Sequence, residues 1–186
     1  MKNIFITLDG VDGVGKTTVA KLIAEHFAFK YYKSPTGEFA TLRSKVESPE
    51  NVIGRYCFYR LATEHDSTNI EAILKETSVV CDRYIASTFA HHIAMDESIR
   101  SIHSEHHILK PDFSFLLYAS SEIRDQRIKK RNIKGSDFVI ENNSELLDRT
   151  ADVFLSLDLI FINTDNKEPL DVVSEIISKI KKRRIK

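Results

Sequence analysis

Short apolar runs alternate along this chain with longer segments whose apolar residues are three or four positions apart. The run at residues 4–8, Ile-Phe-Ile-Thr-Leu, is short and continuous, and it predicts a buried strand. Similar short runs, rich in aromatic and β-branched residues, predict further strands at residues 30–33, 78–81, 113–118 and 159–163.

The segments between these runs have helical periodicity. In residues 18–27, Val19, Leu22, Ile23 and Phe27 fall on one helix face. Further helices are expected at residues 39–46, at 54–75 as one or two helices, at 87–109 with a break near Met95, and at 122–131, 145–157 and 170–180. Strands that alternate with helices predict an α/β fold, in which a five-stranded parallel sheet has helices on both faces in three layers.

The segment between the first strand and the first helix contains a complete phosphate-binding motif. Residues 9–18 read DGVDGVGKTT, which includes G-x-x-x-x-G-K-[ST] in its strand–helix context and predicts a P-loop NTPase fold. Its backbone N–H groups would cradle the phosphates of ATP, the lysine would reach the outer phosphates, and the Thr17 hydroxyl would bind Mg²⁺. The expected nucleotide-binding residues are Gly10, Asp12, Gly13, Val14, Gly15, Lys16, Thr17 and Thr18.

A second constellation follows the third predicted strand. Asp82 is placed to hold Mg²⁺ beside the P-loop, and Arg83 offers a planar cation to phosphate oxygens. The alternative is a structural Asp–Arg pair that closes the turn. Because ligands of parallel sheets bind at the carboxyl ends of the strands, these two residues should share one crevice with five others: Asp9, Asp12, Lys16, Lys33 and Pro35.

A basic segment follows the fourth predicted strand. It includes Arg127 and Arg131, which are four positions apart and so lie on one helix face. Arginines that close over the transferring phosphoryl group would stabilise its charge, which predicts a basic lid over about residues 124–144. The alternative is a solvated helix face.

Composition excludes several classes of protein. The 186 residues carry 27 basic and 27 acidic side chains, which fits one domain without the global charge that attracts nucleic acid or membrane. Cys57 and Cys81 form no disulfide or zinc pattern, so a reducing cytoplasm is expected. We expect no signal peptide and no membrane span, and the histidines have no recognised metal-ligand spacing.

In its ordered motifs the chain resembles the thymidylate kinase family. The family's P-loop stands at residues 9–18, its DRY-x-x-S motif at residues 82–87, and its Pro-Asp before a strand at residues 111–112. Residues 126–141 resemble the lid, and residues 147–150 match the helix that follows it. The resemblance implies ATP and Mg²⁺ as cofactors, a small nucleotide such as dTMP as acceptor, and a homodimer.

The resemblance also assigns roles to residues. Lys16, Asp82, Arg83, Arg127 and Arg131 would be catalytic, with Arg83 bridging the two phosphoryl groups. Arg43 would grip the acceptor's monophosphate, and Phe58 would stack on its base, although core packing is the alternative for this ring. The other implied acceptor contacts are Asp12, Pro35 and Ser87.

The acceptor side departs from the family pattern. An arginine that helps to read thymine is replaced by Ala62, with Arg60 two residues earlier, and a Tyr-Gln pair is replaced by His91-His92. The family's R-E-P reads Lys-Ser-Pro at residues 33–35, and the lid's Asp-Arg reads Asp-Phe at residues 137–138. A relaxed acceptor preference, a kinase of nucleosides or other hydroxyl compounds, and a nucleotide-binding regulatory module therefore stay open as alternatives.

Overall fold

The computed structural model describes residues 2–46, 50–130 and 144–184. Its centre is a five-stranded sheet in the order β2-β3-β1-β4-β5, and every adjacent pair is parallel. This confirms the expected fold class and all of the expected strands within one or two residues. The strands are β1 (Phe5–Asp9), β2 (Lys30–Lys33), β3 (Val79–Asp82), β4 (Phe113–Tyr118) and β5 (Ile160–Asn163).

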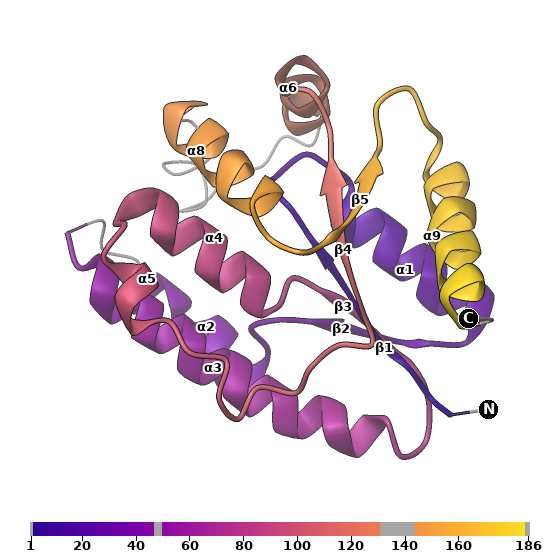
Figure 1. Cartoon of the computed structure of the whole chain (residues 1–186), viewed down its shortest axis with the longest axis horizontal. Coiled ribbons are helices and arrows are strands. Elements are labelled where there is room, and N and C mark those ends of the chain that lie inside the picture. Colours follow the sequence, from indigo (N-terminus) through magenta and orange to yellow (C-terminus); the bar gives the residue numbers. More distant parts are fainter. Residues whose placement is uncertain (1, 47–49, 131–143, 185–186) are drawn as a thin grey trace.

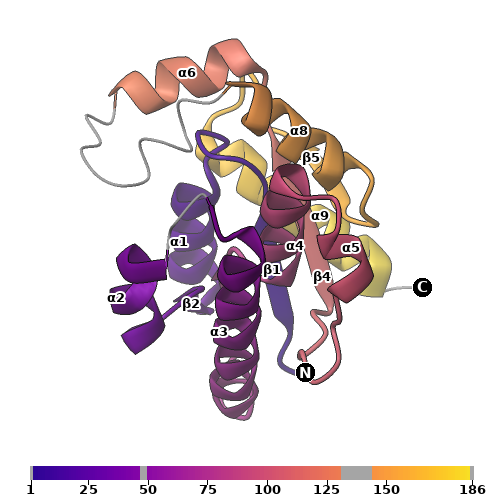
Figure 2. The same cartoon turned by 90° about the vertical axis from the view of Figure 1, so that its left-hand side faces the viewer.

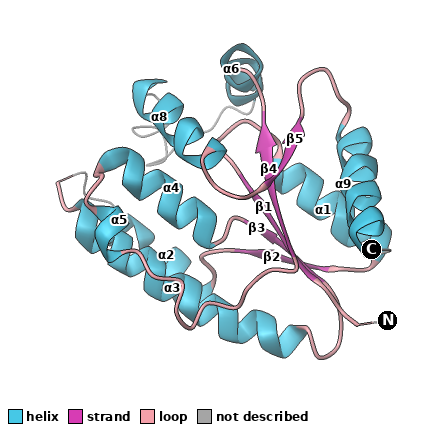
Figure 3. Ribbon diagram, in the orientation of Figure 1, coloured by secondary structure: helices cyan, strands magenta, loops and turns pink. Residues whose placement is uncertain are grey.

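Helices cover both faces of the sheet, as Figure 1 and the ribbon in Figure 3 show. Helices α1 (Lys16–Phe27) and α9 (Pro169–Arg184) pack together on one face. On the other face α4 (Ile85–Met95) lies between α3 (Val52–Ile73) and α8 (Ser144–Leu155). The remaining described helices are α2 (Gly37–Val46), α5 (Ile99–Ile102) and α6 (Ser121–Lys130), of which α6 lies above the carboxyl ends of the strands in Figure 2.

The alternation of side chains along β1 divides the core between the two faces. Ile6 and Leu8 are fully buried in one cluster with Ile23 of α1, whereas Phe5 packs in another with Ile70 of α3. Because successive strand residues point to opposite faces, one apolar run supplies both halves of the core. Such a run is typical of a central strand in a parallel sheet.

Two helical expectations needed adjustment. The segment expected at 54–75 as one or two helices is one helix, α3 (Val52–Ile73), whose first turn is capped by the Asn51 side chain accepting from Gly54 N at 2.8 Å. The helix expected at 87–109 ends at Met95, which confirms the break, but only the short α5 follows and residues 103–112 are not helical. Asp96 adopts an extended backbone and accepts from Ser98 N, which ends one helix and starts the next turn.

Among the described residues, no helix is long and apolar enough to cross a membrane.

Candidate active site

A cavity of about 440 Å³ opens at the carboxyl ends of β1, β2 and β3. Its walls come from the P-loop, from the segment after β2, from the turn after β3 and from one side each of α3 and α4. Of the seven side chains expected to meet in one crevice, Asp9 does not line it, and the other six do: Asp12, Lys16, Lys33, Pro35, Asp82 and Arg83. The cavity lining also includes Gly13, Gly15, Thr17, Arg43 and Ser87 from the sequence-based set, whereas Gly10, Val14 and Thr18 are outside it.

The P-loop owes its path to close packing on β4. Gly10 has φ of 137°, and a Cβ built on it would lie 2.3 Å from the Leu117 carbonyl oxygen. A side chain at this position would meet both backbone strain and a clash with a strand that cannot move away. The tight turn that begins at Gly10 then places Lys16 at the start of α1, facing the cavity.

A backbone carbonyl of the P-loop holds the Lys16 side chain inside the loop. Its Nζ donates to the Val11 carbonyl oxygen at 2.7 Å and lies 3.6 Å from Asp12 Oδ1. Burial lowers the pKa of Lys16 to about 8, and the positive charge of Arg83 acts in the same direction, against the carboxylates of Asp12 and Asp82. The ammonium group is therefore short of negative charge, which suits an anion such as a phosphate.

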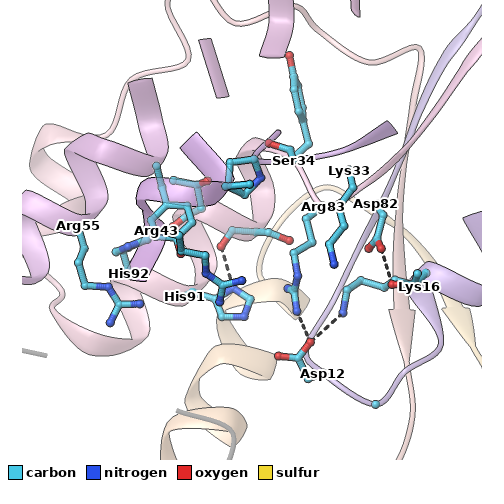
Figure 4. A pocket seen from close by; sticks show the side chains of 18 of the residues that line it. Asp12, Lys16, Lys33, Ser34, Arg43, Arg55, Asp82, Arg83, His91 and His92 are labelled. Atoms are coloured by element: carbon cyan, nitrogen blue, oxygen red, sulfur yellow. Dashed lines mark hydrogen bonds and ion pairs between the residues drawn. The ribbon is translucent and has the colours of Figure 1, made fainter. Parts of the chain in front are cut away.

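Arg83 and Asp12 form an ion pair across the cavity floor, drawn as a dashed line in Figure 4. Arg83 also donates to the Gly10 carbonyl oxygen at 3.2 Å, and its backbone has φ of 70°, which is uncommon for a residue with a side chain. Burial would raise the pKa of Asp12, but the charges of Arg83 and Lys16 outweigh burial and hold it well below its usual range. Asp12 therefore stays ionised and orients both Lys16 and Arg83.

The Thr17 hydroxyl donates to Asp82 Oδ2, which brings a hydroxyl and a carboxylate oxygen together at the edge of the P-loop. Both are hard oxygen donors, and Mg²⁺ in phosphoryl-transfer sites takes one or two protein oxygens and completes its shell with water and phosphates. These two residues therefore fit the magnesium ion that the family implies. The part of the chain that the structure describes holds no cluster of three or more His, Cys, Asp or Glu side chains suited to another metal.

Asp9 lies beneath the cavity and does not line it. Its Oδ1 accepts from the backbone N–H groups of Tyr84 and Ser87, each at 3.1 Å, and from the Ser87 hydroxyl at 2.6 Å. Burial raises the pKa of Asp9 more than these hydrogen bonds lower it. Its geometry joins the end of β1 to the start of α4, so it positions Ser87 rather than meeting a ligand.

The other end of the cavity is built from α3 and α4. Figure 4 places Arg55 and His92 on the side away from Lys16 and Asp82, with Arg43 and His91 between the two ends. Tyr59 lines this end as well, and its ring centroid is 5.4 Å from that of His92. Burial lowers the pKa of His91 to about 3 and that of His92 to about 4, so both rings are neutral at pH 7.

Arg55 and Tyr59 were missed by the sequence analysis. The signal was present, because Arg55, Tyr59 and Ala62 recur at helical spacing on one face of α3. The predicted stacking ring, Phe58, is outside the cavity lining and packs on Phe39 with ring centroids 5.6 Å apart. Its stacking role stays a prediction.

Arg60 does not take over the role of the missing arginine. Its Nε donates to the Ser104 carbonyl oxygen at 2.6 Å, and its other nitrogens donate to Glu64 and to the His106 carbonyl oxygen. Arg60 therefore ties α3 to the segment after α5 and is outside the cavity lining.

Of the predicted lid, the structure describes the first part, which belongs to α6. Arg127 donates to the Thr164 carbonyl oxygen at 2.9 Å, to the Thr164 hydroxyl at 3.0 Å and to the Gly13 carbonyl oxygen at 3.4 Å. It thus joins the P-loop to the segment after β5. Arg131 and the Asp137-Phe138 pair lie outside the described residues, while Ile128 of α6 reaches the cavity.

Comparison with known proteins gives a consistent result. A protein of Methanococcus aeolicus named "Probable thymidylate kinase" is 32% identical, covering 98% of each chain. The thymidylate kinase of Mycoplasma genitalium is 30% identical over 96% of this chain and 95% of its own. The solved structure of Candida albicans thymidylate kinase has a TM-score of 0.76 at 18% identity, over 98% of this chain and 93% of that one, which supports the P-loop NTPase fold.

The family model for thymidylate kinase matches residues 8–176, a range that runs from the last residues of β1 into α9 and includes every segment that lines the cavity. With relatives of at least 30% identity along nearly the whole chain, this match shows that the chain belongs to the thymidylate kinase family, whose members are nucleoside monophosphate kinases.

Proposed function

We propose that this chain transfers the γ-phosphoryl group of ATP to thymidine monophosphate and so forms the diphosphate. The observation that carries the proposal is one cavity with a P-loop at one end and, at the other, a recess lined by Arg55, Tyr59 and the uncharged ring of His92. Such a cavity accommodates two phosphate groups in its charged part and a flat base in its recess. Membership of the thymidylate kinase family supports the same assignment.

In this reaction the phosphate end supplies charge and position. Lys16 binds the outer phosphates of ATP, and Arg83 bridges donor and acceptor phosphates from the opposite side of Asp12. A preorganised cation at the transferring group stabilises the charge of the transition state without reorganisation at the moment of reaction. Bound Mg²⁺, held through Thr17 and Asp82, would neutralise phosphate charge.

The attacking atom is an oxygen of the acceptor's own phosphate. That oxygen is already ionised, so the step needs positioning and charge neutralisation and no strong general base. Arg43 lines the cavity between its two ends and is our candidate for gripping the acceptor phosphate, with Pro35 and Ser87 beside the acceptor. Asp9, which lies beneath the cavity with its Oδ1 accepting from the backbone and the hydroxyl of Ser87 in α4, is not needed as a base in this step.

A coupled assay for ADP formation tests the proposal against its alternatives. ATP and Mg²⁺ are held saturating while dTMP, dUMP, dCMP, dGMP and thymidine are compared as acceptors by kcat/KM. We expect dTMP to be the best acceptor. Activity with thymidine and with no monophosphate would indicate a hydroxyl kinase, and ADP formation with none of the five would indicate a nucleotide-binding module.

We also propose that the chain forms a homodimer in the cytoplasm, as the family resemblance implies. Exposed apolar side chains on α3 and α5, among them Leu61 at 57% and Ile102 at 46% exposure, offer surface for a second copy. Sedimentation equilibrium tests this directly. A mass of one chain at micromolar concentration would contradict it.

A further inference from the structure

Two buried polar atoms at the far end of the cavity have no partner among the described residues: Nε of Arg55 and Nε2 of His92. Arg55 is 5% exposed and His92 is 3% exposed, yet both side chains line the cavity. Buried polar atoms are nearly always hydrogen-bonded, because each orphan costs about 1–3 kcal/mol of desolvation. Asp9, Asp66 and Arg124 also have such atoms, but among the described residues with one, only Arg55 and His92 line the cavity, so a ligand bound there is the candidate partner for both atoms.

The hydrogen-bonding role of His92 Nε2 follows from the other ring nitrogen. His92 Nδ1 lies 2.6 Å from the Thr88 carbonyl oxygen, which can only accept, so Nδ1 carries the proton. Burial keeps the ring neutral by lowering its pKa to about 4. In a neutral imidazole with a proton on Nδ1, Nε2 is an acceptor with a free lone pair. This nitrogen therefore requires a donor from the ligand.

Arg55 requires the opposite. A guanidinium has donors and no acceptor, so its orphan Nε–H needs an acceptor atom from the ligand. Arg55 lies two helical turns before Ala62, on the same face of α3, and Ala62 itself is 1% exposed with no polar side chain. The family pattern has its arginine at the position of Ala62. In this chain the arginine on the same face of α3 is Arg55, two turns earlier.

The rings around His92 hold it in place for recognition. The Tyr56 ring meets it nearly edge-on with centroids 5.9 Å apart, and the Tyr59 ring is tilted against it at 5.4 Å. Because Tyr59 lines the cavity, it also offers apolar surface next to the two orphan atoms. A flat ring with polar edge atoms matches this combination of surface and hydrogen-bonding groups.

We propose that Arg55 and His92 together select the base of the acceptor by its imide edge. His92 Nε2 accepts the N3–H of thymine or uracil, and Arg55 donates to the O4 carbonyl oxygen beside it. Cytosine presents a lone pair at N3 and an amino group at position 4. An acceptor would then face the acceptor His92 Nε2, and a donor would face the donor Arg55. The inference rests on the proposed function for the position of the acceptor, and it goes beyond that function by naming the residues that set specificity.

The experiment compares dTMP with dCMP in the wild type and in Arg55→Leu and His92→Leu. The wild type should prefer dTMP by at least about 10²-fold in kcat/KM, because a mismatched edge leaves buried groups unpaired. Each substitution should lower this ratio by about tenfold or more, the scale of one hydrogen bond to a charged or buried group. KM for ATP should stay unchanged, which separates loss of base recognition from general damage to the fold.

Conservative and control variants complete the test. His92→Gln should keep most of the selectivity, since an amide oxygen can accept where Nε2 did. Arg60→Leu and His103→Leu remove an arginine and a histidine of structural clusters outside the cavity lining, so they should lower the melting temperature and leave the ratio unchanged. Should Arg55→Leu fail to fold, Arg55→Met, an unbranched side chain without an N–H donor, provides the same comparison.

Two failures are distinguishable. If no monophosphate is phosphorylated, the proposed function is wrong, and calorimetric binding of dTMP against dCMP still tests the two residues. If dTMP is phosphorylated and the dTMP-to-dCMP ratio survives both leucine substitutions in folded protein, the inference is overturned while the function stands. Guanine carries the same N–H beside one carbonyl oxygen on a larger double ring, with an amino group in place of the second carbonyl, so dGMP tests whether the recess accepts a purine.

Discussion

The two ends of the cavity satisfy their polar groups in different ways. At the phosphate end, Lys16 is bonded to the Val11 carbonyl oxygen, Arg83 is paired with Asp12, and the Thr17 hydroxyl meets a carboxylate. At the far end, Arg55 Nε and His92 Nε2 are buried without a partner. One end is thus organised by the protein's own contacts, whereas in our proposal the base of the acceptor completes the other.

The difference shows how one fold can keep a reaction and change its substrate. Phosphate groups look the same in every nucleotide, so a site for them can be built from one short loop and held rigid by its own contacts. Bases differ in their edge atoms, and a site that discriminates must leave matching atoms free. Substitutions at the phosphate end should therefore change the rate, and those at the far end should change the choice of acceptor.

The largest expected effect is at Lys16. Replacing it by alanine removes the cation at the transferring phosphoryl group, and kcat should fall by about 10²–10³-fold. Folding should hold, because the lowered pKa of Lys16 shows that its buried charge does not stabilise the folded protein relative to the unfolded chain. The assay is ADP formation, with Lys21→Ala, an exposed lysine on the same helix, as control. Turnover close to normal in folded Lys16→Ala would show that the two ends do not differ as described.

Gly10→Ala should lower the free energy of unfolding by about 3 kcal/mol, because strain at positive φ and contact with the Leu117 carbonyl oxygen add. Gly15→Ala is the matched control. It also has positive φ, but a Cβ there meets nothing within 4 Å, so its cost should be clearly smaller. Denaturant unfolding compares the two. Equal losses would mean that packing on β4 does not shape the phosphate end.

The far end should impose a pH dependence on stability. In the unfolded chain a histidine takes up its proton near pH 6.5, whereas burial lowers the pKa of His92 to about 4 in the folded protein. Between these values the unfolded state binds more protons, so the folded state loses stability as the pH falls. From pH 7 to pH 5 this loss is about 2 kcal/mol for one such group.

His92→Gln should therefore lose less stability than the wild type over the same pH range, by about that amount. Chemical denaturation at each pH measures the difference. The same change with pH in both proteins would show that the His92 ring is protonated as easily in the folded protein as in the unfolded chain.

The smallest expected effect concerns Arg127, which contacts the P-loop from α6 without lining the cavity. Arg127→Ala should raise KM for ATP by about tenfold, equivalent to ~1.4 kcal/mol, through loss of hydrogen bonds that hold Gly13 and Thr164. The exposed Lys129 of the same helix is the control, and its alanine variant should behave as wild type. A fall in kcat at constant KM would instead favour the lid role that the basic segment predicts.

Prediction from sequence succeeded where the signal is local. The strand–loop–helix order around the P-loop and the strands near residues 78–81 and 113–118 follow from short runs and fixed spacings. It failed at residues 103–109, where helical spacing continued in a segment that the structure shows as non-helical. There the left-handed backbone of His107, with φ of 63°, is incompatible with a continuing helix, and nothing in the apolar pattern marks it.

The sequence by itself determined the parts of this protein whose partners lie within one motif: the P-loop with Lys16 and Thr17, and the order of strands and helices that makes a parallel α/β sheet. Only the tertiary structure decided which residues meet at the far end. Whether Arg55, Phe58 or Arg60 faces the cavity depends on how α3 is rotated against α4, and that rotation is set by packing between segments distant in the chain. A contiguous loop carries its geometry in its own residues, whereas a site between two helices acquires its geometry only when they pack.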